Sequence, residues 1–312
     1  MQKYLSISIV SWNTEELLRQ CLASLYANLG ELDTEVIVVD NASSDGSVDM
    51  VTREFPQVKL IRNASNCGFA RANNIAYEQS SGRYFLLLNS DTIVRPGSLE
   101  SLAKYMDGNL AVGAVAPRLL NGDGSLQRSC SCFPTPFTEF LSAFSLGKLF
   151  WKSPFFARFE MSYWNFDEVR EVDFAGGSCL MLRRAALEQV GALDEDYFMY
   201  TEEADLCYRL KRGGWKVMFI PHAEIVHLGG QSSRLRPVEM AIELPVSRHR
   251  FIKKFYGPLS AALFRGVVAV GGVCRLIVWG CALIVKGRKA ELEQGLKVQR
   301  GLLKWSVTGG RK

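Results

Sequence analysis

The stretch EVIVVDNASSDGS (residues 35–47) carries the pattern on which the fold prediction rests. A run of β-branched residues ends in a carboxylate at Asp40, and a loop of small hydrogen-bonding residues follows it. A helix is expected next, over residues 47–55. A buried strand followed by a polar turn and a helix is typical of one unit of a parallel sheet.

The same alternation extends to both sides of this stretch. Strands are expected at residues 5–10, 58–61 and 84–88, and helices at 15–28 and 69–79. Further strands are expected at 112–117, 179–182 and 217–220, with a helix at 203–212. The sequence therefore predicts an α/β fold of Rossmann type, with a mainly parallel sheet flanked by helices. Ligands of such sheets bind at the carboxyl ends of the strands, where Asn13, Asp40, Asn41 and Asp91 stand.

Charge divides the chain into two regions. Residues 1–235 contain 22 Lys and Arg against 28 Asp and Glu, whereas residues 236–312 contain 15 against 4. We expect a nucleotide-binding catalytic domain over 1–235 and a basic, apolar helical region over 236–312. Within the first region, the segment 133–165 is rich in Phe, Trp, Ser and Pro and is expected to be a partly helical insertion. The eight cysteines show no Cys-x-x-Cys spacing, which favours reduced core thiols.

The basic region contains the apolar run GVVAVGGVCRLIVWGCALIV (266–285). Its length would allow it to span a membrane, but a central Arg costs about 2.5–3.5 kcal/mol there. On a helical wheel Arg265, Arg275 and Lys286 fall within about 80° of one another. This stripe favours a helix on the membrane surface with its basic residues toward lipid phosphates; a spanning helix and a soluble core or dimer helix are the alternatives.

Two strand ends carry polar motifs that suit a nucleotide and a metal. Asp40 can accept hydrogen bonds from a base imide or a ribose hydroxyl, although an N-cap and turn would use the same residue types. The segment LLLNSDT (86–92) ends a very apolar strand in Asn89, Ser90 and Asp91. A carboxylate at that position can hold a divalent cation that neutralises a leaving diphosphate. Capping of a helix near Pro96 is the competing interpretation of Asp91.

Three further segments contain candidate site residues. In NCGFARANN (66–74), Arg71 and two asparagines lie on the first turns of a helix, either facing a phosphate or forming a solvated face. In DEDYFMYTEEADLCYRLKRGGWKV (194–217), Glu202 and Glu203 open a helix and Asp205 and Arg209 have the spacing of an ordinary salt bridge. In HAEIVHLGGQSS (222–233), His227 ends a strand-like run before two glycines and suits a metal or diphosphate.

Taken together, these segments resemble glycosyltransferase family 2, the inverting enzymes with the GT-A fold, and are especially similar to its bacterial rhamnosyltransferase-like branch. The resemblance covers about residues 5–235 and rests on IVSWN (9–13), VVDNASSDGS (38–47), NCGFARANN, LLLNSDT, VDFAGGSCLMLRRAALEQVGALDEDYFMYTEEADLCYRLKRGGW (172–215) and VHLGGQS (226–232). Asn89 stands where the family has the first acid of its metal motif, and Glu203 where it usually has Asp.

The resemblance implies a role for each matched residue. Nucleotide contacts are implied for a first group: Trp12, Asn13, Asp40, Asn41, Arg71, Asn89 and Ser90. Asp91 and His227 would bind the metal, Mn²⁺ or Mg²⁺. Asp173, Gly176 and Gly177 would shape the acceptor side. Glu203 would be the general base, with its neighbour Glu202 as the alternative.

The expected function is therefore inverting transfer of a sugar from a UDP- or dTDP-sugar, with dTDP-rhamnose as one candidate. The acceptor would be a hydroxyl of a glycan or polyprenyl-linked molecule in cell-surface polysaccharide assembly. We expect an anionic membrane partner, no nucleic-acid partner, and a cytoplasmic protein peripheral on the inner face of the plasma membrane.

Two other functions compete with this one. A non-catalytic, membrane-associated nucleotide-sugar-binding protein would keep the fold without needing acids at 91 and 203. A sugar-phosphate nucleotidyltransferase would carry a Gly-rich, basic loop after the first strand, where SWNTEELL (11–18) stands.

Overall fold

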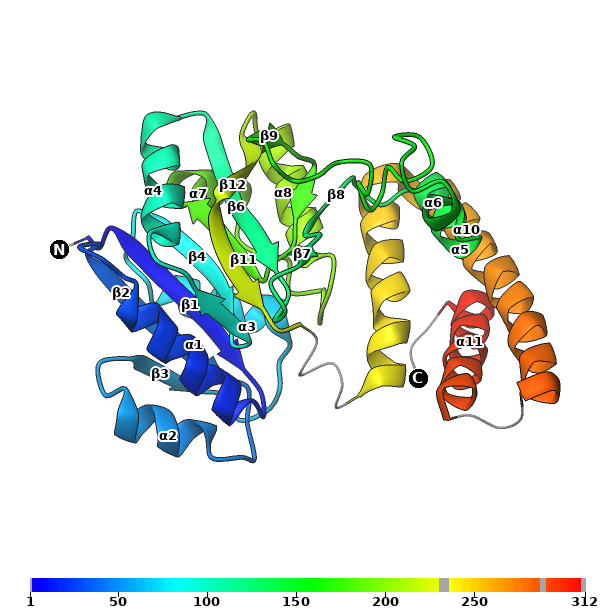
Figure 1. Ribbon diagram of the computed structural model, residues 1–312, viewed down its shortest axis with the longest axis horizontal. Coiled ribbons are helices and arrows are strands. Elements are labelled where there is room, and N and C mark those ends of the chain that lie inside the picture. The colour runs from blue at the N-terminus through cyan, green and yellow to red at the C-terminus, as the bar shows by residue number, and fades with distance from the viewer. Residues whose placement is uncertain (1, 230–235, 287–289, 310–312) are drawn as a thin grey trace. The chain divides into compact units, whose positions relative to one another are not determined.

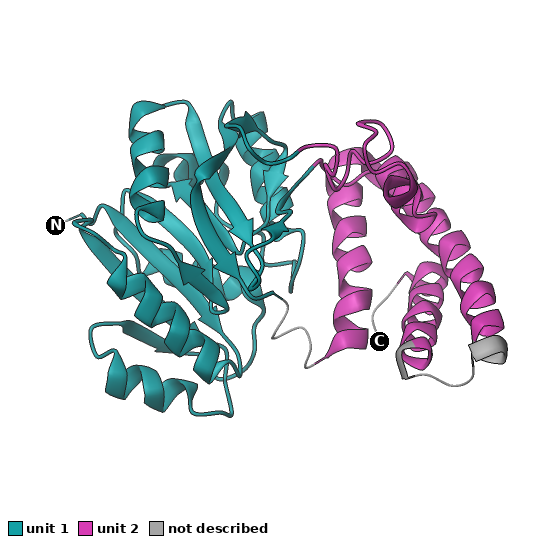
Figure 2. Ribbon diagram, in the orientation of Figure 1, with its two compact units in different colours: residues 1–131, 165–232 teal, residues 132–164, 233–312 magenta. Residues whose placement is uncertain are grey.

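The computed structural model describes residues 2–229, 236–286 and 290–309, with side chains for all of these except 283–286, 290 and 291. The chain forms two compact units (Figure 2). Unit 1 comprises residues 1–131 and 165–232, and unit 2 comprises residues 132–164 and 233–312. The domain boundary expected at residue 235 falls outside the described residues. The segment 133–165, expected as an insertion, groups almost entirely with the C-terminal helices.

Unit 1 is built around one mixed sheet (Figure 1). Its first part alternates strands and helices: β1 (Leu5–Ser11), α1 (Glu15–Ala27), β2 (Thr34–Asp40), α2 (Ser47–Glu54), β3 (Lys59–Arg62), α3 (Phe69–Glu78) and β4 (Tyr84–Asn89). Its second part contains β5 (Thr92–Val94), α4 (Ser98–Gly108), β6 (Val112–Leu120), β7 (Leu126–Gln127), β8 (Cys130–Ser131), β9 (Arg170–Glu171), β10 (Phe174–Ala175), β11 (Cys179–Arg183), α7 (Arg184–Val190), α8 (Glu202–Arg212) and β12 (Lys216–His227).

The strand order is β3-β2-β1-β4-β11-β6-β12-β5, with β7 added beside β6 and β9 beside β12. Strands β1 to β4 pair in parallel, as do β6 and β12, whereas β11 pairs antiparallel with both of its neighbours. The sheet is therefore mixed and mainly parallel in its first half, as the alternating pattern predicted.

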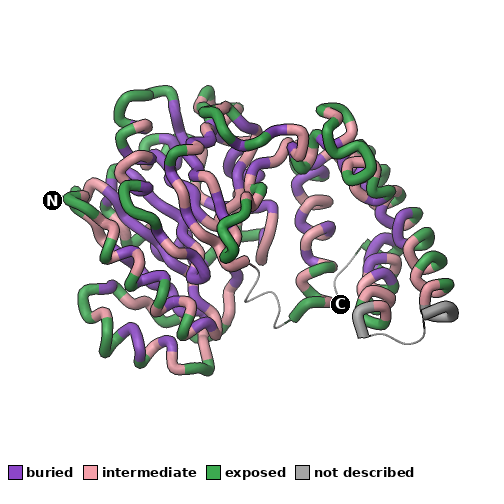
Figure 3. Tube along the Cα trace, viewed as in Figure 1, coloured by how far each residue is buried: buried purple, intermediate pink, exposed green. Residues whose placement is uncertain are grey.

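The residue pattern of β1 explains how the sheet is covered on both faces. Leu5, Ile7 and Ile9 are fully buried in a cluster with side chains of α1, α2 and α4. The intervening Ser6 and Ser8 are also buried and face the other side, where Ser8 Oγ donates to Asn73 on α3 at 2.7 Å. Both faces of the strand are thus covered by helices, and the buried strands are visible in Figure 3.

Strand β12 is much longer than the four residues expected from its apolar run. Its pairing with β6 continues past Pro221 after a shift of register between Ile220 and Glu224. Proline lacks the N–H that a regular ladder needs, so it is tolerated in a sheet mainly at such irregularities. The strand resumes beyond the proline and carries His227 to its end.

Unit 2 contains α5 (Pro136–Ala143), α6 (Leu146–Leu149), α10 (Pro237–Lys286) and α11 (Ala290–Thr308). Helix α10 bends at Gly257, where φ is 84°, just before Pro258. Its first half buries Phe251 completely, and its second half does the same with Phe264. Among the described residues one helix is long and apolar enough to cross a membrane: the Pro237–Ala282 part of α10, whose most apolar stretch has a mean hydropathy of 1.9 and is 28% buried.

The two described arginines of the expected basic stripe have other partners. Arg265 donates to the carbonyl oxygens of Ser306 and Val307, near the end of α11, at 2.5–3.0 Å. Arg275 donates to the carbonyl of Ser142 at 3.3 Å and of Ala143 at 3.0 Å, at the end of α5. The side chain of Lys286 lies outside the described residues. These two arginines therefore complete helix C-termini, whose last carbonyl groups have no donor within their own helix. That the basic stripe also faces lipid phosphates stays a prediction.

Candidate active site

The carboxyl ends of three adjacent strands bring the predicted nucleotide and metal residues to one edge of the sheet. Pairing in register sets Ser11 beside Asp40 and Val10 beside Asn89. The loop after β1 is joined to the end of β4 through Thr14, whose hydroxyl lies 3.0 Å from Ser11 Oγ and 3.1 Å from Ser90 Oγ. Ser90 therefore anchors this edge through its hydroxyl, and Trp12 lies half-buried in the same loop.

Asp40 presents a carboxylate oxygen that no protein group satisfies. The side chain is 3% exposed, and Oδ2 accepts a hydrogen bond from the backbone N–H of Ser43 at 3.0 Å. Oδ1 is buried and has no hydrogen-bond partner in the described part of the chain. A buried polar atom without a partner is costly, so this oxygen is suited to a donor supplied by a ligand. The second oxygen meanwhile holds the loop in the conformation that the ligand would meet.

Asn13 and Asn41, both predicted to contact the nucleotide, are largely engaged by the protein. Asn13 has a φ of 52° and accepts hydrogen bonds from the backbone N–H and hydroxyl of Ser44, which joins the loops after β1 and β2. Asn41 is 2% exposed; its amide donates to Gly68 O at 3.2 Å and accepts from Asn63 at 2.8 Å. Both residues therefore fix the shape of the loops around Asp40.

Helix α3 presents one exposed cation near this edge. Arg71 is exposed and lies 3.8 Å from a carboxylate oxygen of Glu195. The neighbouring Asn73 and Asn74, expected on a phosphate-facing or solvated surface, are buried; Asn74 pairs with the backbone of Leu193 in both directions. Arg71 is thus the polar group on these turns that remains accessible to a ligand.

The two residues predicted to bind metal lie where the end of β4 meets the end of β12. The antiparallel pairing of β12 with β5 sets His227 beside Thr92. His227 Nε2 then lies 3.2 Å from Asp91 Oδ1 and 3.4 Å from Asn89 Nδ2. Asp91 is 7% exposed, and its backbone carbonyl accepts from the N–H of Leu228 at 2.9 Å. The two residues predicted to bind metal are therefore brought together by backbone pairing.

Gln127, which the sequence analysis did not single out, orients the histidine. Its Oε1 lies 2.6 Å from His227 Nδ1, and its Nε2 donates to His227 O at 3.1 Å and to Asn121 Oδ1 at 2.9 Å. Because the amide nitrogen of Gln127 is used as the donor, its Oε1 is left to accept from Nδ1–H, and Nε2 is the ring nitrogen that faces Asp91. Such an outer partner fixes the tautomer of histidines that bind metals. Gln127 lies on the two-residue strand β7, which is too short to give a recognisable sequence pattern.

The residues of this corner fit a divalent cation that is shared with a ligand. No cluster of three or more His, Cys, Asp or Glu side chains suited to a metal occurs in the described ranges. One carboxylate and one imidazole are the available donors, since Asn89 turns its amide nitrogen toward the histidine. Mg²⁺ is commonly bound by one or two carboxylates together with substrate phosphates and waters. This donor set therefore suits a cation that binds together with a diphosphate.

Helix α8 begins at a strained point of the backbone. Tyr200 and Thr201 have φ values of 69° and 72°, a conformation that costs energy in residues other than glycine and often marks functional sites. Glu202 is 4% exposed, whereas Glu203 is only partly buried. Cys207 lies one turn further along α8. Burial raises the pKa of its thiol, and the charge of Glu203 raises it further. The salt bridge predicted between Asp205 and Arg209 is confirmed at 2.6 Å.

The predicted acceptor loop lies beside α8. Helix α8 packs against β10, and Gly176 and Gly177 follow that strand directly. Gly176 N–H donates to Ser129 O at 2.8 Å, and a side chain at Gly177 would come within 3.2 Å of the Phe69 ring. Asp173 lies 3.5 Å from Lys211 Nζ on α8. The helix that carries Glu203 in its first turn therefore packs beside the strand that leads into this loop.

Comparisons with known proteins agree with this architecture. The family model described as glycosyl transferase family 2 matches residues 6–191. The N-acetylglucosaminyl-diphospho-decaprenol L-rhamnosyltransferase of Mycobacterium tuberculosis is 30% identical over 248 residues, 76% of this chain and 80% of its own length. Rhamnosyltransferase WbbL of Escherichia coli K12 is 28% identical over 236 residues, 73% of this chain and 84% of its own length.

A solved structure with the same fold is that of the mannosyltransferase PcManGT from Pyrobaculum calidifontis in complex with GDP-Man and Mn²⁺. Its TM-score is 0.57 at 15% sequence identity, and the alignment covers 100% of this chain and 89% of that one. Unit 1 therefore has a GT-A-like fold. Because the family model covers more than half of the chain and the relatives span most of their own lengths, this protein belongs to glycosyltransferase family 2.

Proposed function

We propose that this glycosyltransferase is inverting and metal-dependent, and that it moves L-rhamnose from dTDP-rhamnose to a hydroxyl of a lipid-linked glycan. The observation that carries the proposal is the corner where His227 Nε2 lies 3.2 Å from Asp91, at the same sheet edge as the buried unsatisfied oxygen of Asp40. The choice of rhamnose is supported by the names of the two relatives. A UDP-sugar is the alternative donor.

The sheet edge offers one group for the base or ribose of the donor and others for its diphosphate. Asp40 Oδ1 accepts from a base imide N–H or a ribose hydroxyl, and Arg71 pairs with phosphate oxygens. Asp91 and His227 would hold Mn²⁺ or Mg²⁺. The cation, when bound, supplies positive charge that stabilises the departing nucleoside diphosphate.

Glu203 acts on the acceptor. As the partly exposed acid at the start of α8, it removes the proton from an acceptor hydroxyl next to the loop of Gly176 and Gly177. The oxygen attacks the anomeric carbon as the bond to the diphosphate oxygen breaks, so the proton ends on Glu203 and the electron pair on the diphosphate. A single displacement inverts the anomeric centre.

Unit 2 provides the surface that contacts the membrane, where a lipid-linked acceptor would lie. Large apolar side chains are exposed on its helices, including Leu259, Leu263, Val270, Ile277 and Val278 on α10. Such a surface is typical of membrane contact, and one relative is named for a decaprenol-linked acceptor. The enzyme therefore lies on the inner face of the plasma membrane and takes a polyprenyl-linked glycan from it.

The decisive experiment is donor turnover by the full chain with Mn²⁺, with Mg²⁺ and with a chelator. Wild-type protein should hydrolyse or transfer from dTDP-rhamnose only with the metal, and Asp91→Asn should lose most of that activity while remaining folded. Asp49→Asn, which removes an exposed acid on α2 of the same unit, serves as the matched control. Nucleotide-sugar binding without turnover under all conditions would instead indicate a non-catalytic binding protein.

A further inference from the structure

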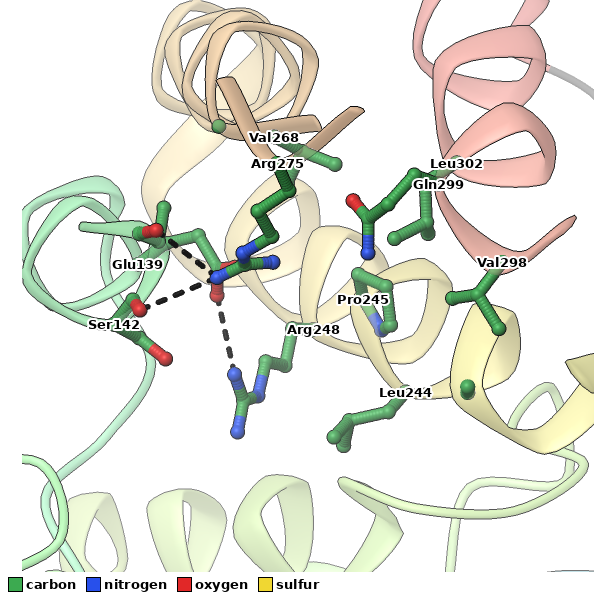
Figure 4. A pocket seen from close by; sticks show the side chains of 13 residues that line it. Glu139, Ser142, Leu244, Pro245, Arg248, Val268, Arg275, Val298, Gln299 and Leu302 are labelled. Carbon is green, nitrogen blue, oxygen red and sulfur yellow. Dashed lines mark hydrogen bonds and ion pairs between the residues drawn. The ribbon is translucent and has the colours of Figure 1, made fainter. Parts of the chain in front are cut away.

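Unit 2 contains a cavity of about 220 Å³ that takes no part in the proposed transfer reaction (Figure 4). It is lined by α5, by both halves of α10 on either side of its bend, and by α11. The volume is below the range of roughly 300–1,000 Å³ that is usual for a complete small-molecule site. The cavity therefore suits the head of a ligand and the first part of a chain, with the rest of the ligand outside.

Charged groups gather on one side of this cavity. Arg248 pairs with Glu139 at 3.1 Å, and Arg275 donates one nitrogen to two backbone carbonyls of α5. A guanidinium has five N–H donors, so both arginines retain donors beyond these contacts. The lining carries two arginines and one glutamate, a net charge of one positive. Arginine recognises phosphate through its planar donor geometry, which makes an oxyanion the favoured occupant.

Gln299 is a second and independent indication of a ligand. The residue is 4% exposed, and its Oε1 is buried with no hydrogen-bond partner in the described part of the chain. In Figure 4 its amide projects into the cavity opposite Arg275. A buried amide oxygen without a donor is unfavourable, and a hydroxyl of a ligand, such as a P–OH group, would donate to it. The amide nitrogen can in turn donate to a phosphate oxygen.

The remaining lining is apolar, which determines what the oxyanion is attached to. Leu244, Val268 and Leu302 also line the cavity. The same helices expose further apolar side chains outside it, Phe140 on α5 and Val270 on α10 among them. A free phosphate would leave these walls without a partner, whereas an alkyl or isoprenoid chain would bury against them.

We propose that this cavity binds the phosphate group of a membrane lipid together with the first carbons of its chain. Arg248, Arg275 and Gln299 contact the phosphate, and the apolar wall contacts the chain. Glycerophospholipids and polyprenyl phosphates share this chemistry. The proposal does not depend on which sugar unit 1 transfers.

The test is equilibrium binding to the full chain in neutral detergent micelles, with three probes: dioleoyl phosphatidic acid, undecaprenyl phosphate and inorganic phosphate. A fourth probe, dioleoylglycerol, has the chains without the phosphate. We expect saturable binding of at least one of the two lipid phosphates, at least tenfold tighter than that of inorganic phosphate or dioleoylglycerol. Tighter binding of undecaprenyl phosphate identifies the acceptor lipid as the occupant, and tighter binding of phosphatidic acid identifies a bilayer lipid. Equal binding of inorganic phosphate, or of dioleoylglycerol, overturns the proposal.

The key variant is Gln299→Met, which keeps the length and charge of the residue but removes its hydrogen bonds. Lipid-phosphate affinity should fall at least about tenfold. The thermal stability of the ligand-free protein should stay the same or rise, because an unsatisfied amide is replaced by an apolar group. Gln294→Met, an exposed position on the same helix, should change neither. Val298→Phe, which narrows the cavity from its wall, should also weaken binding. Unchanged binding by either cavity variant overturns the proposal.

Discussion

Replacing Glu203 by Gln should separate catalysis from donor binding in this enzyme. The substitution keeps the size of the side chain and removes its ability to accept a proton. Loss of a general base typically costs a factor of roughly 10²–10⁴, equivalent to about 2.7–5.5 kcal/mol in the activation barrier. Donor affinity should change less than about twofold, because the proposed donor contacts are made by Asp40, Arg71 and Asp91 and not by α8.

The neighbouring Glu202 provides the matched control for this variant. Consecutive residues of a helix point about 100° apart, so only one of the two acids can face the acceptor loop readily. Glu202 is 4% exposed, which leaves little of it accessible to an acceptor, whereas Glu203 is partly exposed beside β10. Glu202→Gln should therefore reduce turnover less than about tenfold and act mainly on stability.

The assay is steady-state transfer to an acceptor, alongside calorimetric binding of the nucleoside diphosphate, for both variants. If Glu202→Gln proves the more damaging change, the base has been assigned one residue too late. If both variants transfer normally while the donor still binds, the general-base interpretation of this helix is wrong.

Three further predictions follow from particular contacts. Gln127→Leu should weaken Mn²⁺ binding about 10–100-fold in titration calorimetry, because it removes the partner that orients His227, the proposed metal ligand. The melting temperature should stay within a few degrees. Unchanged metal affinity would count against that orientation. Ile277→Glu, on the exposed face of α10, should reduce binding to anionic vesicles in sedimentation assays, whereas Leu110→Glu, at a still more exposed position in unit 1, should not. Burial raises the pKa of the Cys21 thiol to about 12, so this thiol should stay protonated and resist maleimide at pH 8. The exposed thiols of Cys274 and Cys281 on α10 should react within minutes, and mass spectrometry of the labelled protein checks both expectations.

The first half of the fold was predictable because its strands are buried on both faces and its helices follow them at short intervals. The expected and observed ends of β1, β2 and β4 differ by at most one residue. The order of strands beyond β4 was not predictable in this way. Strand β11 inserts antiparallel between β4 and β6, and such pairing depends on contacts distant in sequence rather than on local periodicity.

For the site, sequence patterns located the strand ends but not the partners of each polar group. Asp91 and His227 were selected from separate motifs, and the register of β12 against β5 sets them together. Asn13 and Asn41 have the residue type and location that a nucleotide contact would need, and in the structure they also hold loops together. An asparagine in a turn can satisfy either requirement, and only the positions of its neighbours decide between them.

The arginines of α10 show why charge in an apolar helix is difficult to interpret from sequence. A helical wheel gives the direction in which Arg265 and Arg275 point but not what lies there. Lipid phosphates and the carbonyls of a helix C-terminus both attract a guanidinium, because both present negative charge in a poorly hydrated setting. Here each arginine completes the end of another helix, Arg275 keeps further donors for the cavity of unit 2, and apolar side chains of α10 are exposed. The membrane contact of this unit should consequently depend more on those apolar side chains than on these two arginines, so that vesicle binding falls further with Ile277→Glu than with added salt.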